Sequence, residues 1–94
     1  LQLMTANHLA PNLPTDTSIL TPGHGFGLGF AVRTEPGIAA FPGSVGQFFW
    51  AGIAGTFFWV DPVEELFAVF MSQGPGQRDY FRTLVRDLVY AAAV

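Results

Sequence analysis

The chain has no cysteine and no lysine, and only 12% of its 94 residues are charged. Without cysteine there can be no disulfide, no thiolate metal site and no cysteine nucleophile. Without lysine there can be no phosphate loop of the Walker type. The four basic residues are all arginine and stand against seven acids, for a net charge of −3. No basic stripe can therefore neutralise a phosphate backbone, and we expect no nucleic-acid partner.

Long apolar runs are also lacking. The longest, residues 48–60, contains two glycines and is shorter than the roughly 20 residues that a membrane helix needs, so we expect no membrane span. No signal-peptide pattern is visible at the start. The chain opens at Leu1 inside an apolar-periodic pattern with no capping residue ahead of it, which is typical of a helix cut in the middle. Half of the residues are apolar, so the chain needs a core, and its length permits one small domain.

The first third of the chain predicts a helix end, a loop and a strand. Residues 1–9 have the pattern of the last turns of a helix, and residues 10–23 contain three prolines, so 1–23 is a helix end followed by a loop. Apolar and small residues then alternate over 24–32, which predicts a strand. Because Gly25, Gly27 and Gly29 share one face of it, we expect a helix to approach that face closely; a glycine-rich loop is the alternative.

Three further strands and a helix are predicted after residue 46. Residues 47–50 and 56–60 flank a reversal at 51–55, and the turn at Asp61-Pro62 leads to the apolar run 66–71, which we expect to be covered on both faces. The fold class is thus α+β: an antiparallel meander of about four strands over 24–73, with a terminal helix over 77–93 packed on one face. The helix carries one apolar stripe and an opposite, solvated arginine face: Phe81, Leu84, Val85 and Leu88 against Arg78, Arg82 and Arg86.

Several familiar sites are excluded by spacing. GHGFGLG at 23–29 fails the dinucleotide fingerprint because the third glycine is misplaced. Around Ser44 the first glycine of a serine-hydrolase elbow is displaced by one position. His8 and His24 have no partner at ligand spacing, so we interpret both as structural and expect no metal and no cofactor. The acids Asp61, Glu64 and Glu65 fall in a hairpin turn, where we expect them to be solvated.

Three segments in a fixed order carry a family resemblance: GHGFGLGF, then FFWAGIAGTFFWVDPVEELFAVFMSQ, then a helix ending in LVRDLVY. This order resembles the C-terminal region of β-lactamase and penicillin-binding-protein-like serine hydrolases, especially class C β-lactamases and their esterase relatives. The resemblance covers nearly the whole chain. It implies that residues 1–94 are the C-terminal part of a β-lactamase-like serine hydrolase domain whose parent forms and hydrolyses an acyl-serine intermediate.

The resemblance also implies site residues. Trp50-Ala51-Gly52 stands where many members have Lys-Thr-Gly, and the next backbone N–H, of Ile53, would be one of two oxyanion-hole donors. Gln73 stands where relatives carry a polar residue that contacts substrate. By residue type alone, Trp50 could instead be a strand aromatic that simply packs. Because Trp50 replaces the lysine, an ester or a neutral acyl compound is favoured over a penicillin as the substrate.

The two other motifs of the family are absent. Ser-x-x-Lys fails at each of the three serines, and Tyr-x-Asn fails at both tyrosines, so we expect the chain to be inactive alone. The alternative is a non-catalytic binding or self-assembly module with an aromatic-rich sheet surface. In either case we expect a homo-oligomer, or pairing with the missing remainder of the domain, through an unpaired strand edge. The compartment stays open between bacterial cytoplasm, periplasm and secretion.

Overall fold

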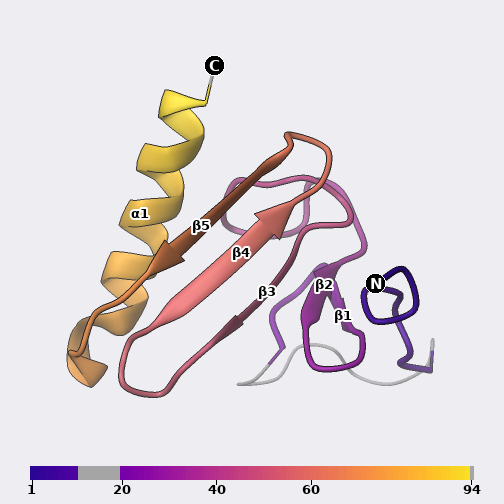
Figure 1. Ribbon diagram of the computed structural model, residues 1–94, viewed down its shortest axis with the longest axis horizontal. Coiled ribbons are helices and arrows are strands. Elements are labelled where there is room, and N and C mark those ends of the chain that lie inside the picture. Colours follow the sequence, from indigo (N-terminus) through magenta and orange to yellow (C-terminus); the bar gives the residue numbers. More distant parts are fainter. Residues whose placement is uncertain (11–19, 94) are drawn as a thin grey trace.

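The structure is a computed structural model, and it describes residues 1–10 and 20–93. One antiparallel sheet of five strands runs in sequence order, followed by a single turn of 3-10 helix and one α-helix (Figure 1). The fold is α+β, as predicted. The elements are β1 (His24–Phe26), β2 (Ala31–Arg33), β3 (Phe48–Ala51), β4 (Phe57–Asp61), β5 (Leu66–Phe70), η1 (Pro75–Gln77) and α1 (Arg78–Ala92).

The prediction of one strand over 24–32 is wrong, because this segment forms the β1–β2 hairpin. His24 pairs with Arg33, and Phe26 pairs with Ala31. The Gly27 N–H donates to the Phe30 carbonyl at 2.8 Å and closes the turn. Gly29 has φ +99°, a left-handed conformation that glycine adopts without steric cost. Gly29 therefore belongs to the turn and not to one face of a strand. Because the segment forms two strands, the sheet has five strands where about four were predicted.

The N-terminal segment, and not a helix, approaches the other two glycines. A Cβ on Gly27 would lie 1.9 Å from the carbonyl oxygen of Met4, and one on Gly25 would lie 2.2 Å from the side chain of Asn7. The helix end predicted for residues 1–9 is a set of turns in the structure, with the Thr5 N–H donating to Leu1. Figure 1 shows this segment beside the hairpin. Most of the loop predicted over 10–23 lies outside the described residues.

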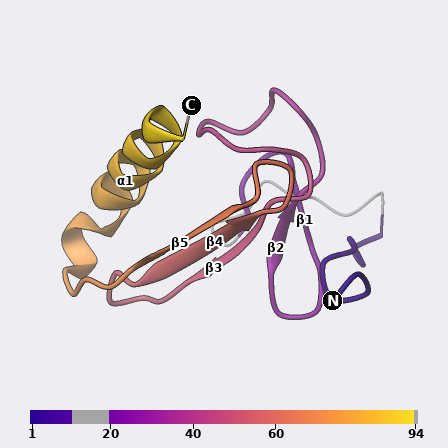
Figure 2. The ribbon, with the colours of Figure 1, turned by 45° about the horizontal axis from the view of Figure 1, so that its top comes forward.

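Strands β3, β4 and β5 form the part of the sheet that α1 covers (Figure 2). On one face Trp59 is fully buried and stacks against Tyr90 of α1, while Phe70 contacts Phe81. The opposite face of β5 leaves Phe67 75% and Val69 61% exposed. The prediction that β5 is covered on both faces is therefore wrong. An apolar run in an outer strand had the same sequence signature as a doubly buried one.

The prediction of a solvated arginine face on α1 is also wrong. Arg86 is only 7% exposed and is the one buried residue of the helix, whereas Leu88, assigned to the apolar stripe, is 60% exposed. The helix is thus rotated so that its arginines face the turn between β3 and β4 and the aromatic rings of these two strands. Among the residues that the structure describes, no helix has the length and apolar character needed to span a membrane.

Candidate active site

The reversal between β3 and β4 forms a tight corner that begins at Gly52. The Gly52 N–H donates to the Thr56 carbonyl at 2.8 Å, and the Gly55 N–H donates back to the Gly52 carbonyl at 3.2 Å. A Cβ on Gly52 would lie 2.5 Å from Oγ1 of Thr56, so a larger residue at this position would displace the Thr56 side chain. Gly55, with φ +125°, closes the turn.

Ile53 is the most open residue of this corner. It is 82% exposed, and its backbone N–H donates to no acceptor within residues 1–10 and 20–93. An exposed N–H without an intramolecular partner is available to a ligand oxygen. Such an N–H can serve as the oxyanion donor that the resemblance implies for Ile53.

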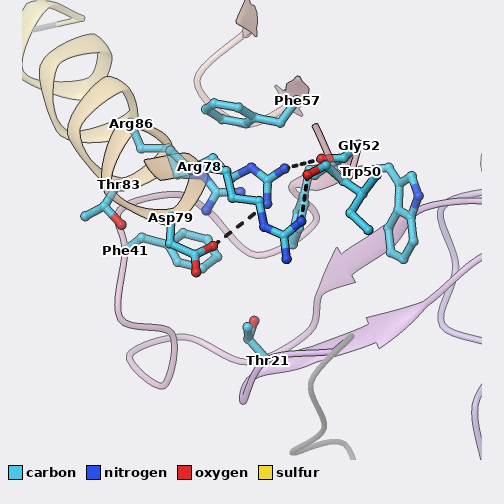
Figure 3. Close-up of a pocket in the computed structure, with 13 residues that line it drawn as sticks. Thr21, Phe41, Trp50, Gly52, Phe57, Arg78, Asp79, Thr83 and Arg86 are labelled. Atoms are coloured by element: carbon cyan, nitrogen blue, oxygen red, sulfur yellow. Dashed lines mark hydrogen bonds and ion pairs between the residues drawn. The ribbon is translucent and has the colours of Figure 1, made fainter. Parts of the chain in front are cut away.

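A cavity of about 490 Å³ lies between this corner and the start of α1 (Figure 3). The structure brings four of the five predicted site residues to it, namely Trp50, Ala51, Gly52 and Ile53, whereas Gln73 is exposed and does not line the cavity. The remaining lining residues come from β3, β4, α1 and two loops: Thr21, Phe41, Phe49, Phe57, Arg78, Asp79, Arg82, Thr83 and Arg86.

Three arginines of α1 are the functional feature that sequence reasoning missed. Nη1 of Arg78 donates to the Ile53 carbonyl at 2.7 Å, and Nη2 of Arg82 donates to the Gly52 carbonyl at 2.6 Å. Their spacing of four was visible in the sequence as a stripe. A stripe opposite the apolar residues of a helix predicts a solvated face. Here the acceptors are backbone carbonyls, which no sequence pattern marks.

Arg86 lies deeper, among aromatic rings. Its guanidinium carbon is 3.9 Å from the ring centre of Phe41 and 4.9 Å from that of Phe49. The negative ring faces attract the cation and partly replace its lost hydration. Burial, together with repulsion from Arg33 and Arg82, lowers the pKa of Arg86 to about 10, so the residue still carries its charge at neutral pH.

Ser44 and Asp61 form a separate polar cluster with Tyr90. The Asp61 carboxylate is fully buried and accepts the Ser44 hydroxyl at 3.0 Å and the Tyr90 hydroxyl at 2.7 Å through one oxygen. The other oxygen accepts the N–H groups of Val63 and Glu64, each at 3.1 Å. The prediction that Asp61 is solvated is therefore wrong, while Glu64 is exposed as predicted.

The surroundings of Asp61 set its charge state. Burial alone would raise its pKa, but the hydrogen bonds from Tyr90, Glu64, Ser44 and Val63 outweigh burial and hold it below its ordinary value of 3.8. Conversely, burial and the bond to Asp61 raise the pKa of Tyr90. In this cluster the hydroxyls of Tyr90 and Ser44 are neutral and both donate to the charged Asp61 carboxylate. Because the pKa of Asp61 is low, its carboxylate is a weak base for the Ser44 hydroxyl.

Both histidines have structural partners. Nε2 of His8 lies 2.7 Å from the Leu3 carbonyl oxygen, and Nδ1 of the buried His24 lies 3.1 Å from the Pro22 carbonyl oxygen. Burial lowers the pKa of His24 and keeps it neutral at pH 7. In the described part of the chain, no three His, Cys, Asp or Glu residues gather into a metal-binding group.

A comparison with protein families decides the kind of chain to which this corner and cavity belong. The sequence model described as Beta-lactamase matches residues 2–92. The chain belongs to the Beta-lactamase family. No curated protein matches it.

Among solved structures, this member of the Beta-lactamase family is similar to EstCE1, which is described as a hydrolase with promiscuous acyltransferase activity. The TM-score is 0.80 and the sequence identity is 29%, and the match covers 94% of this chain. It covers 23% of EstCE1, so the chain spans about a quarter of that structure's length. The five-stranded sheet with its single helix is accordingly part of a β-lactamase-like hydrolase fold.

Proposed function

We propose that residues 1–94 are the C-terminal part of a serine hydrolase that acts on esters, to which they contribute one wall of the acyl-transfer site. The observation that carries this proposal is the backbone N–H of the exposed residue Ile53, which has no acceptor among the described residues, at a corner that opens on a cavity. Membership of the Beta-lactamase family and the similarity to EstCE1, a hydrolase with promiscuous acyltransferase activity, support it.

In this proposal the chain stabilises charge and positions substrate. A serine elsewhere in the complete polypeptide attacks the ester carbonyl, whose oxygen becomes negative and accepts a hydrogen bond from the Ile53 N–H. One such preorganised donor contributes about 3 kcal/mol to the lowering of the barrier. Collapse of the tetrahedral intermediate expels the alcohol and leaves an acyl-serine, which water then hydrolyses by the same route.

Trp50 and Gln73 contribute to substrate choice in this proposal. Trp50 is partly exposed beside the cavity and offers an aromatic face where lactam-hydrolysing relatives have a lysine, which favours an ester or neutral acyl group over a carboxylate-bearing lactam. Gln73, exposed after β5, could reach only a substrate that extends beyond the cavity.

The chain by itself is expected to be catalytically silent. Among the described serines, Ser44 donates to Asp61, whose lowered pKa makes it a weak base, and Ser72 donates to a backbone carbonyl. Purified residues 1–94 should therefore release no burst of nitrophenol from p-nitrophenyl butyrate. The control is Ser44→Ala, which should behave like the parent chain. Robust turnover that this substitution abolishes would show that the nucleophile lies within the chain, and the proposal would fail.

A covalent label tests the same proposal in the complete polypeptide. A fluorophosphonate should modify one serine, and mass spectrometry should place it N-terminal to Leu1 within a Ser-x-x-Lys sequence. Labelling of Ser44 or Ser72 would contradict the proposal that the nucleophile lies outside residues 1–94. If a folded complete polypeptide is not labelled and also lacks Ser-x-x-Lys and Tyr-x-Asn, it is not a serine hydrolase of this kind.

Self-association is a second candidate property, favoured by the open face of the outer strand β5. Phe67, Val69 and Met71 are all exposed there, and an unpaired strand edge promotes pairing between copies. Light scattering after size-exclusion chromatography should give at least a dimer for micromolar residues 1–94, and Phe67→Glu should shift it toward monomer. Val63→Glu, at an equally exposed turn position, is the matched control. A clean monomer would exclude self-assembly.

A further inference from the structure

Two consecutive carbonyl groups of the corner are held by α1. Arg82 donates to the Gly52 carbonyl at 2.6 Å and Arg78 donates to the Ile53 carbonyl at 2.7 Å, and Figure 3 shows these bonds reaching the corner from the helix. The Gly52 carbonyl and the Ile53 N–H belong to the same peptide group. Whatever orients the carbonyl of Gly52 must therefore also orient the N–H of Ile53.

The planarity of the peptide bond makes this coupling rigid. The described chain has no cis peptide bond, so the Ile53 N–H points in the direction opposite to the Gly52 carbonyl. With the carbonyl bound to Arg82, the N–H points away from the guanidinium and has no acceptor in the part of the chain that the structure describes. A rotation of this plane about its flanking bonds would redirect both groups together.

The corner needs such an external constraint. It starts and ends at glycine, and its only internal bond to the Gly52 carbonyl is the 3.2 Å contact from Gly55. Glycines allow alternative peptide orientations at little cost. The bond from Arg82 is shorter and charge-assisted, and therefore the stronger of the two.

The charge of Arg82 also acts along the peptide group. Its side chain is only 18% exposed, and the acid paired with it, Asp79, lies 3.9 Å away with 93% of its side chain exposed. The positive charge is thus little screened where it meets the carbonyl. A cation on a carbonyl oxygen polarises the amide and strengthens its N–H as a donor.

We propose that Arg82 is a positioning residue for catalysis: it fixes and polarises the Gly52–Ile53 peptide so that the Ile53 N–H is held ready for the oxyanion. This inference rests on the proposed function. Arg82 also lines the cavity and its Nη2 reaches the Thr56 carbonyl at 3.4 Å, but the role proposed for it runs through its shorter bond to the Gly52–Ile53 peptide. Arg78 is different, because its acceptor belongs to the following peptide and its bond does not set the direction of the Ile53 N–H.

Kinetics of the complete polypeptide separate these two arginines. Arg82→Met keeps an unbranched apolar side chain at this position and removes the donors; we expect kcat for p-nitrophenyl butyrate to fall at least about tenfold with KM changed less than twofold. Arg82→Lys should recover part of kcat. Arg78→Met is the matched comparison, because it removes the same charge from the same end of the helix. Its fall in kcat should be at least about fivefold smaller than that of Arg82→Met. Equal losses, or a loss confined to KM, would overturn the proposal.

An NMR measurement tests the peptide group without turnover. Residues 1–94 contain two Gly–Ile peptides, Gly52–Ile53 and Gly37–Ile38, so pairing carbonyl-13C glycine with 15N isoleucine selects them, and the second is an internal reference. In Arg82→Met the Gly52 carbonyl resonance should move upfield while that of Gly37 stays in place. An unmoved Gly52 resonance would overturn the positioning role. If the complete wild-type polypeptide is inactive but Arg82→Met still moves the Gly52 resonance, the proposed function is refuted while the structural role of Arg82 stands.

Discussion

Ile53→Pro is expected to lower kcat of the complete hydrolase about 100-fold, since it deletes the backbone N–H proposed to bind the oxyanion. The loss should fall on kcat and kcat/KM together, because the hydrogen bond strengthens only as negative charge develops on the substrate oxygen. The measurement is steady-state hydrolysis of p-nitrophenyl butyrate.

The turn should accept proline at this position. Ile53 is the second residue of the turn closed by the bond from Gly55 to Gly52, and proline is favoured at the second position of common turns. The residue before it is glycine, Ile53 is exposed, and its N–H makes no hydrogen bond to residues 1–10 or 20–93 that proline would remove. A fall in activity at an unchanged melting temperature therefore reports on the N–H.

Ile53→Ala is the control for this prediction. It shortens the side chain as proline does but keeps the N–H, so it should retain kcat within about threefold. If both variants lose activity equally, the exposed side chain is what the substrate contacts. If neither does, the oxyanion donor is elsewhere and the role assigned to the corner is wrong.

The β3–β5 meander could be predicted because its signals are local. Small residues at 51–55 mark one reversal and Asp61-Pro62 marks the next, and aromatic and branched residues fill the strands between them. The β1–β2 hairpin could not, because Gly27 and Gly29 continue the alternation of a strand through a turn. The bond from the Gly27 N–H to the Phe30 carbonyl and the positive φ of Gly29 distinguish the two interpretations, and the alternation of residue types shows neither of them.

Of the candidate site, the sequence predicts the β3–β4 corner but not the arginines of α1 that contact it. The order of the motifs predicts that Trp50 to Ile53 belong to the site. The rotation of α1, in contrast, depends on the acceptors that the β3–β4 turn presents to the helix. A stripe of arginines is ordinarily solvated, but here carbonyl acceptors at the corner hold Arg82, and the ring of Phe41 receives Arg86. Neither partner lies near these arginines in sequence, so the missed contacts are long-range ones.

Asp61 should be the residue on which folding of this region depends most. Its carboxylate accepts two hydroxyls and two backbone N–H groups, and so ties the start of the β4–β5 turn to Ser44 and to Tyr90 near the end of α1. Asp61→Ala leaves these donors unpaired in a buried place. We expect the free energy of unfolding in urea at pH 7 to fall by about 3 kcal/mol or more. Glu64→Ala, which removes an exposed acid and leaves the backbone N–H bonded, should change it by less than about 0.5 kcal/mol.

The pH dependence of that loss identifies its cause. Because the pKa of Asp61 is lower in the folded state than its ordinary value of 3.8, the folded state favours the charged form. The carboxylate therefore stabilises the fold fully above pH 3.8, and this contribution disappears as the pH falls through the lower folded-state pKa. The stability difference between wild type and Asp61→Ala should accordingly shrink in acid, with the hydroxyl bonds of Ser44 and Tyr90 weakened as the carboxyl gains its proton. A difference that stays constant from pH 7 to pH 2 would mean that Asp61 contributes through packing alone.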